Sequence, residues 1–288
     1  MTAQQPIARP VFPAETLERM AALYPQRAGL LHHHLPDHPL LSLEALATLA
    51  EGLPAGQVEY NPGDVPIGIL PEDLPSNGLS IGETIRTIDS NGSWAVLKNI
   101  ETEDAYRTLL MDLLGELEPI VEPRTGAMLT PQGFIFVSSP GSITPFHFDP
   151  EHNILLQLRG TKVMNVWPAG DERFAHRREH ERYHTGGHRN LPWQDHYRSD
   201  AQQVPLAPGD AVLMPVMAPH FVANGEAPSI SLSITWRSEW SYRESEAHAA
   251  NATLRRIGLD PAMPPRWPSH AWAKTIGWRI ARRLRLVS

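Results

Sequence analysis

The sequence predicts a mainly β protein with flanking helices, in which short strands form a sandwich or a small barrel. Short apolar runs separated by Pro, Gly and Asp turns fill residues 127–237, and helical spacing occurs before and after this region. Alternating β-α units, which would indicate a parallel sheet, are not seen. We therefore expect three parts: an N-terminal helical and irregular segment packing on the barrel (1–126), the barrel itself (127–240) and C-terminal helices (241–288).

The N-terminal part has the spacing of short helices. We expect helices over 14–25 and over 42–52, the second beginning at Ser42. Residues 53–80 are rich in Pro and Gly and predict irregular structure. A longer helix is expected from about Thr102, a good capping residue, to about Leu117.

The central part reads as strands. Polar and apolar residues alternate strictly in the last strand, 229–236, so its two faces differ. Ser231 and Thr235 then line either an internal pocket or a solvated outer face. A tight turn at 159–161 predicts that 154–158 and 162–167 form a hairpin. The other strands expected in this part are 134–137, 144–149, 211–214 and 220–223. After the last strand, helices are expected over 242–256 and 270–285.

The composition excludes several kinds of site. The 288 residues include no cysteine, so disulfides, thiolate metal sites and cysteine nucleophiles are excluded, and a cytoplasmic location is expected. No apolar run is long enough to span a membrane, and no secretory signal is expected at the N-terminus. The net charge is −7, and residues 264–288 alone carry +6. The rest, with 19 basic and 32 acidic residues, carries −13, which argues against DNA binding.

A metal site is indicated by His147-x-Asp149 and by His220, about seventy residues later. In an extended strand, residues i and i+2 point to the same side, so His147 and Asp149 can grip one ion together. Two imidazoles and one carboxylate on one face of the metal are the ligand set of non-haem iron sites. The third ligand must come from another strand.

Over residues 127–237 the motifs resemble the JmjC and cupin-like branch of the iron(II)/2-oxoglutarate-dependent oxygenases, nearest to the asparaginyl hydroxylase of hypoxia-inducible factor. Thr144 precedes the His-x-Asp pair, and Asn153 and Lys162 follow at the offsets of residues that line the family's cosubstrate pocket. The resemblance implies a double-stranded β-helix (jelly roll), iron bound by the three ligands, and 2-oxoglutarate bound by Lys162 and Thr144, with Asn153 nearby. It implies hydroxylation of a protein side chain or small molecule, with release of succinate and CO₂. Thr235 stands where the asparaginyl hydroxylase has Asn, which weakens any transfer of its substrate.

Two alternatives to this activity are a cupin-type metalloenzyme that uses no 2-oxoglutarate, and a non-catalytic sensor or scaffold with the same fold. The insertion around 176–196 carries histidines at four-residue spacing, which fits an entrance or partner loop or a second metal. Four further histidines, at positions 32–34 and 38, are expected to lie in a polar linker. The last helix carries an apolar stripe formed by Trp272, Ile276, Ile280 and Leu284. It predicts docking on the barrel or on a second subunit, giving a possible homodimer through the C-terminal helices. The arginines beside the stripe leave an anionic membrane surface or nucleic acid as the alternative.

Overall fold

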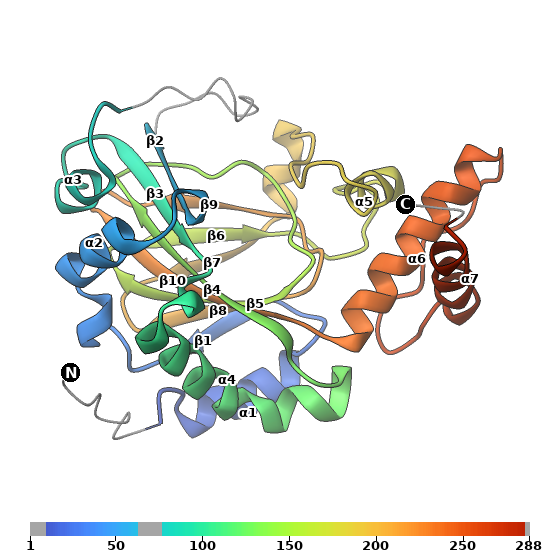
Figure 1. Cartoon of the computed structure of the whole chain (residues 1–288), viewed down its shortest axis with the longest axis horizontal. Helices are drawn as coiled ribbons and strands as arrows, with labels where there is room; N and C mark the ends of the chain where they lie inside the picture. The colour runs from blue at the N-terminus through green and yellow to red at the C-terminus, as the bar shows by residue number, and fades with distance from the viewer. Residues whose placement is uncertain (1–9, 63–76, 286–288) are drawn as a thin grey trace.

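Two antiparallel sheets form the centre of the protein, here described from a computed structural model that covers residues 10–62 and 77–285. The larger sheet has seven strands in the order β1-β8-β5-β10-β4-β3-β2, and the smaller has three in the order β7-β6-β9. Figure 1 shows the strands at the centre, with helices α1, α2, α3 and α4 around the larger sheet and α6 and α7 projecting to one side. The strands are β1 Gly29–His32, β2 Val58–Pro62, β3 Ser93–Lys98, β4 Leu129–Ser138, β5 His152–Arg159, β6 Lys162–Val166, β7 Gln202–Leu206, β8 Asp210–Met214, β9 His220–Asn224 and β10 Ser229–Arg237.

The helices lie before and after the central strands, as the sequence predicts. The α-helices are α1 Ala14–Leu23, α2 Leu43–Gly52, α3 Ile81–Arg86, α4 Asp104–Thr125, α5 Arg177–Tyr183, α6 Glu239–Arg256 and α7 Trp272–Arg283. Short 3₁₀ turns occupy Pro39–Leu41, Ala55–Gln57, Ile100–Thr102 and Asp195–Asp200. None of the helices in the described ranges is long and apolar enough to cross a bilayer.

The two faces of the larger sheet bury different sets of side chains. On β10, Ile230, Leu232, Ile234 and Trp236 belong to the main core, which also holds residues of α1, α2 and α4. A second core contains Leu155, Val212 and Met214 of the larger sheet and Met164, Val166, Val204, Leu206 and Val222 of the smaller one. The interior of the double-stranded β-helix therefore lies between the two sheets, and the helices cover the opposite face of the larger sheet.

The expected hairpin at 159–161 is wrong. Strand β5 pairs with β8 and β10 in the larger sheet, whereas β6 pairs with β7 and β9 in the smaller one. The turn carries the chain from one sheet to the other. Gly160 makes this possible, because its φ is +68° and a Cβ would lie 2.2 Å from the carbonyl oxygen of Pro228. A tight turn between two strands does not by itself specify that they pair.

Several boundaries also differ from the prediction. Helix α4 begins at Asp104 and continues through Pro119 and Pro123 to Thr125, because Val121 and Thr125 extend its buried face. Strand β2 lies inside the segment expected to be irregular, of which residues 63–76 fall outside the described ranges. Strands β1, β3 and β7 were not predicted; β1, β2 and β3 are N-terminal strands that extend the larger sheet.

The histidines at 32–34 are not part of a polar linker. His32 ends β1, and His33 is buried with its Nε2 3.1 Å from the carbonyl oxygens of Gln157 and Asp210. They tie β1 to the larger sheet and form no metal cluster with other described residues.

The last helix packs against α6 through Thr275 and Trp278, which are buried. The predicted apolar stripe of α7 is instead exposed: Trp272, Ile276, Ile280 and Leu284 are each more than half exposed. Docking of that stripe on the barrel is therefore wrong. The homodimer stays a prediction, for which the stripe provides a surface.

Candidate metal centre

The three predicted ligands come from two neighbouring segments of backbone. His147 and His220 form an antiparallel bridge, in which each backbone N–H donates to the other residue's carbonyl, at 3.0 and 2.7 Å. The backbone N–H of Met217 donates to the carbonyl of Asp149 at 2.7 Å. The expected strand around residues 144–149 is wrong, because the segment makes isolated bridges and no regular ladder. These bridges nevertheless place all three side chains on one side.

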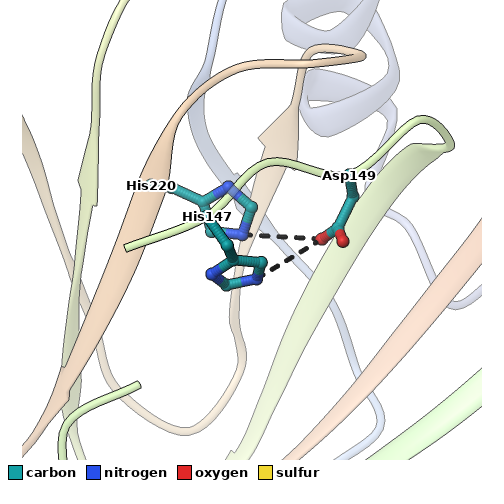
Figure 2. Close-up of side chains that lie close together, drawn as sticks. All are labelled: His147, Asp149 and His220. Atoms are coloured by element: carbon teal, nitrogen blue, oxygen red, sulfur yellow. Dashed lines mark ion pairs between the residues drawn. The ribbon is translucent and has the colours of Figure 1, made fainter. Parts of the chain in front are cut away.

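The three side chains converge, as Figure 2 shows. Asp149 Oδ2 lies 3.7 Å from His147 Nε2 and 3.6 Å from His220 Nε2, and the two imidazole centroids are 4.2 Å apart. In the described part of the chain, this is the only group of three or more His, Asp or Glu side chains whose potential metal-ligand atoms all lie within 4.8 Å of one another. Ligands at about 2.1 Å from one ion stand about 3 Å apart when they occupy adjacent octahedral positions, so the gap suits a metal.

Both imidazoles are oriented for metal binding by their other nitrogen. His147 Nδ1 lies 2.8 Å from the carbonyl oxygen of Pro145, and His220 Nδ1 lies 2.9 Å from that of Ala218. A carbonyl can only accept, so each Nδ1 carries the hydrogen and each Nε2 presents a lone pair to the site. Burial, together with the neighbouring His220, lowers the pKa of His147 to about 3, and burial also lowers the pKa of His220. Both rings are thus neutral near pH 7, as ligation requires.

The carboxylate is held by an arginine that the sequence prediction missed. Arg189 Nη1 donates to Asp149 Oδ1 at 2.8 Å, leaving Oδ2 directed at the two imidazoles. Burial alone would raise the pKa of Asp149, but the guanidinium of Arg189, with His147 and His220, holds it well below its usual range. No sequence signal distinguished this arginine from the other basic residues of the insertion.

The insertion therefore forms part of the site. The N–H of Leu191 donates to the carbonyl of Phe146 at 2.9 Å, and Asn190 forms a bridge with His147. The ligand segment consequently lies between β9 on one side and residues 189–191 on the other. The insertion thus contacts the ligand segment, and its role as an entrance or partner loop stays a prediction.

Lys162 is a buried cation without a partner. It begins β6 and is 5% exposed, and Met164 and Val166, two and four residues on, point into the core between the sheets. Its ammonium makes no hydrogen bond or ion pair with any residue that the structure describes. Burial lowers its pKa to about 7. An unpaired buried charge is costly, so a group kept in this position calls for an anionic ligand.

Thr144 lies across β9 from β6. Its Oγ1 accepts the N–H of Val222 at 2.8 Å, and Val222 pairs with Met164, two residues from Lys162. Its hydroxyl hydrogen is not needed for that bond and can be donated to a ligand. Lys162 and His220 therefore belong to the smaller sheet, and Thr144 is hydrogen-bonded to its strand β9.

Asn153 belongs to the opposite, larger sheet. It is buried, and its Oδ1 accepts the hydroxyl of Ser233 at 2.8 Å. The Ser231 hydroxyl donates to Gln157 Oε1 at 2.7 Å, and Ser231, Ser233 and Thr235 are all buried. The polar face of β10 thus lies inside the barrel, not in solvent, which decides between the two alternatives left by the sequence.

Comparisons with known proteins place the fold. The family model for the cupin-like domain matches residues 81–242. The Jumonji C domain-containing protein 5 of Drosophila melanogaster is 32% identical over 109 residues, which is 33% of this chain and 25% of that protein. The chain thus spans about a quarter of that relative's length.

Among solved structures, YcfD, a ribosomal oxygenase from Escherichia coli, matches with a TM-score of 0.50 and 15% identity, over 97% of this chain and 68% of that one. A structure of YcfD with cobalt and 2-oxoglutarate matches with a TM-score of 0.47 and 17% identity, over 94% and 66%. Identity this low shows a shared fold alone. Resemblance to the hypoxia-inducible-factor hydroxylase, in particular, stays a prediction.

Proposed function

Because this chain belongs to the cupin-like domain family, we propose that it is an iron(II)/2-oxoglutarate-dependent oxygenase that hydroxylates a protein side chain or a small molecule. The single observation that carries the proposal is the pairing of two features. The His147, Asp149 and His220 side chains converge on one point, and the unpaired ammonium of Lys162 projects into the same barrel. Together they match the two ends of a keto acid that chelates a metal and carries a second carboxylate.

The three ligands would hold the metal by one face only. His147 and His220 supply neutral Nε2 atoms, and Asp149 supplies Oδ2 while Arg189 occupies its other oxygen. The opposite face then remains for exchangeable ligands, which distinguishes such a site from a closed structural one. Bound iron would supply the oxidising chemistry, in which O₂ is the oxidant: one of its oxygen atoms enters succinate as 2-oxoglutarate loses CO₂, and the other enters the hydroxyl group formed at a substrate C–H bond.

The cosubstrate's distal carboxylate would bind at Lys162 and Thr144. A charge-assisted hydrogen bond from the ammonium, with a second from the hydroxyl, stabilises a carboxylate far better in a dry interior than in water. The carboxylate in turn compensates the buried ammonium and raises its pKa again. Asn153 lies on the opposite sheet with one of its groups used by Ser233, which suits a wall of the pocket better than an anchor.

A cupin-type metalloenzyme without 2-oxoglutarate would need a buried cation inside the barrel only if its substrate carried an anionic group, whereas 2-oxoglutarate always presents a second carboxylate. The unpaired Lys162 therefore favours the oxygenase. A non-catalytic sensor would retain both the metal ligands and the lysine, so only turnover separates it from an enzyme.

The test is to load the purified chain with iron(II) and to measure 2-oxoglutarate binding by calorimetry and succinate release with candidate peptides and metabolites. We expect 2-oxoglutarate binding that depends on the metal, and succinate formation that is lost in His147→Ala. His196→Gln, which removes an exposed histidine of the insertion, is the matched control and should behave as wild type. Metal-independent binding, or succinate formation by His147→Ala at the wild-type rate, would refute the assignment.

A further inference from the structure

A second group of histidines lies between the insertion and the C-terminal helices. His180 and His184 stand four residues apart at the end of α5, with Glu181 following His180, and α6 brings His248 against both. Figure 1 shows α5 beside α6, on the side of the sheets from which α6 and α7 project. Residues i and i+4 share one face of a helix, so two imidazoles with this spacing can bind one ion.

Most nitrogens of these histidines lack partners. Within the described part of the chain, both nitrogens of His248 and Nε2 of His184 are buried without a hydrogen bond, and the nitrogens of His180 have no partner beyond the backbone of Ala175. His180 and His248 are 0% and 1% exposed. Two buried histidines elsewhere in the described chain do have partners: His33 binds two carbonyls and a backbone N–H, and His152 Nε2 binds the Ser238 hydroxyl. Unsatisfied buried polar groups are rare in folded proteins and call for a missing ion or water.

The charges around the cluster leave room for a cation. Two arginines near the cluster are already paired, since Arg255 binds Glu181 at 2.6 Å and Arg266 binds Glu244 at 2.5 Å. Arg237 and Lys274 are the other cations that act on His184 and His248. Glu181 Oε1 and Glu244 Oε2 remain without hydrogen bonds. Burial lowers the pKa of His180 to about 4 and of His184 to about 3. Both rings are therefore neutral at pH 7, and each has one nitrogen whose lone pair can bind a metal.

We propose that His180, His184 and His248 form a second metal site, for a zinc-type divalent ion, that fastens the insertion to α6. Imidazole is a suitable ligand for zinc, cobalt, nickel and copper ions. The assignment of this site does not rest on the proposed oxygenase activity.

Binding requires the rings to turn. At present they stack face to face, with centroids 4.9 Å apart for His180 and His248 and 5.4 Å apart for His184 and His248, and planes 14° and 21° from parallel. A tetrahedral ion at about 2.0–2.1 Å from each nitrogen needs nitrogens about 3.4 Å apart. Rotation of the imidazoles about their side-chain bonds brings one nitrogen of each toward a common point and exchanges ring stacking for metal–nitrogen bonds.

The site would act on the metal centre through Phe148. The Phe148 ring stacks on His180 with centroids 5.0 Å apart and planes 23° apart, and Phe148 separates His147 from Asp149 in the chain. The same insertion supplies Arg189 to the carboxylate. An ion that fixes α5 would therefore fix both the packing behind the ligand segment and the loop that holds Asp149.

The experiment uses the full chain, stripped with a chelator and dialysed against Zn²⁺, with bound metal measured by elemental analysis. Wild type and His196→Gln should each bind two ions per chain. His248→Gln and His184→Gln should each lose one, and His147→Ala should lose the other. Circular dichroism would establish that each variant is folded, and His184→Gln provides the test if His248→Gln does not fold.

Cobalt(II) substitution supplies an independent signature. A four-coordinate three-histidine site absorbs visible light much more strongly than an octahedral one, so the intense band should persist in His147→Ala and disappear in His248→Gln. Two outcomes overturn the proposal: removal of all bound metal by His147→Ala, or retention of both ions by His248→Gln and His184→Gln. If only the centre formed by His147, Asp149 and His220 fails to bind metal, the wild type and His147→Ala would each hold one ion. Failure of the proposed oxygenase centre is thus distinguishable from failure of the second metal site.

Discussion

Replacing Lys162 by methionine should make the ligand-free protein more stable while it abolishes 2-oxoglutarate binding. The ammonium is buried with no partner among residues 10–62 and 77–285, and burial lowers its pKa from 10.5 to about 7. A pKa difference of one is worth about 1.4 kcal/mol, so the buried lysine costs the folded state on the order of 4 kcal/mol at pH 7. Methionine has similar length and no charge, and removes this cost.

The pH dependence gives the sign of the effect. The folded pKa lies below the unfolded value, so between about pH 7 and 10.5 the unfolded chain holds more protons and stability rises with pH. The penalty is complete below pH 7 and disappears toward pH 10.5. Lys162→Met should thus be most stabilised at or below pH 7, and the difference from wild type should shrink steadily above it.

The assay is urea unfolding at pH 6.5, 8 and 9.5, followed by circular dichroism, with calorimetry of 2-oxoglutarate binding. A gain of about 4 kcal/mol corresponds to a melting-temperature rise of roughly 8 °C in a chain of this size. Lys98→Met is the control: its ammonium is partly exposed and paired with Glu59, so its removal should change stability by less than about 1 kcal/mol. A Lys162→Met variant that is less stable than wild type, or whose advantage does not vary with pH, would refute the reasoning.

Three further outcomes follow from the same geometry. Arg189→Gln leaves one oxygen of Asp149 unpaired and should weaken metal binding about 10–100-fold in a titration, whereas the exposed Arg178→Gln should leave it unchanged. Gly160→Ala should destabilise the fold by about 2 kcal/mol or more in urea, because the new methyl meets the Pro228 carbonyl; Gly92→Ala, at a similar φ in open space, should cost only about 1 kcal/mol. The affinity for 2-oxoglutarate should fall about tenfold for each pH unit above about pH 7, because Lys162 loses its proton there. An affinity that does not vary with pH would contradict the proposed binding of the distal carboxylate by Lys162.

Local patterns were sufficient for the ligand set and most elements of the barrel. The alternation of β10 predicted its strand and its two faces, and Ser42 marked the start of α2 correctly. His147, Asp149 and His220 were found because a facial triad requires particular residue types, two of them at close spacing. The end of α5 at Tyr183 agrees with the sequence, because Gly186 and Gly187 disfavour continuing the helix to His188.

The predictions from sequence were wrong or undecided where a local pattern had to specify which strand or surface a segment packs against. The turn at Gly160 looks the same in sequence whether it joins strands of one sheet or of two, and only the pairing of β5 with β10 and of β6 with β9 distinguishes these arrangements. Likewise, a strand of alternating serines does not specify whether its polar face meets water or an enclosed interior.

The sequence by itself determined which chemistry the chain can support, because metal ligation depends on residue types that are few and recognisable. Only the tertiary structure decided how those groups are tuned. Arg189 reaches Asp149 across forty residues, and His248 meets His180 across two helices. Lys162 lies in an interior where none of the described residues is its counter-ion. Contacts of this kind are set by how sheets and helices pack, and packing is a property of the whole chain, which no local period or spacing records.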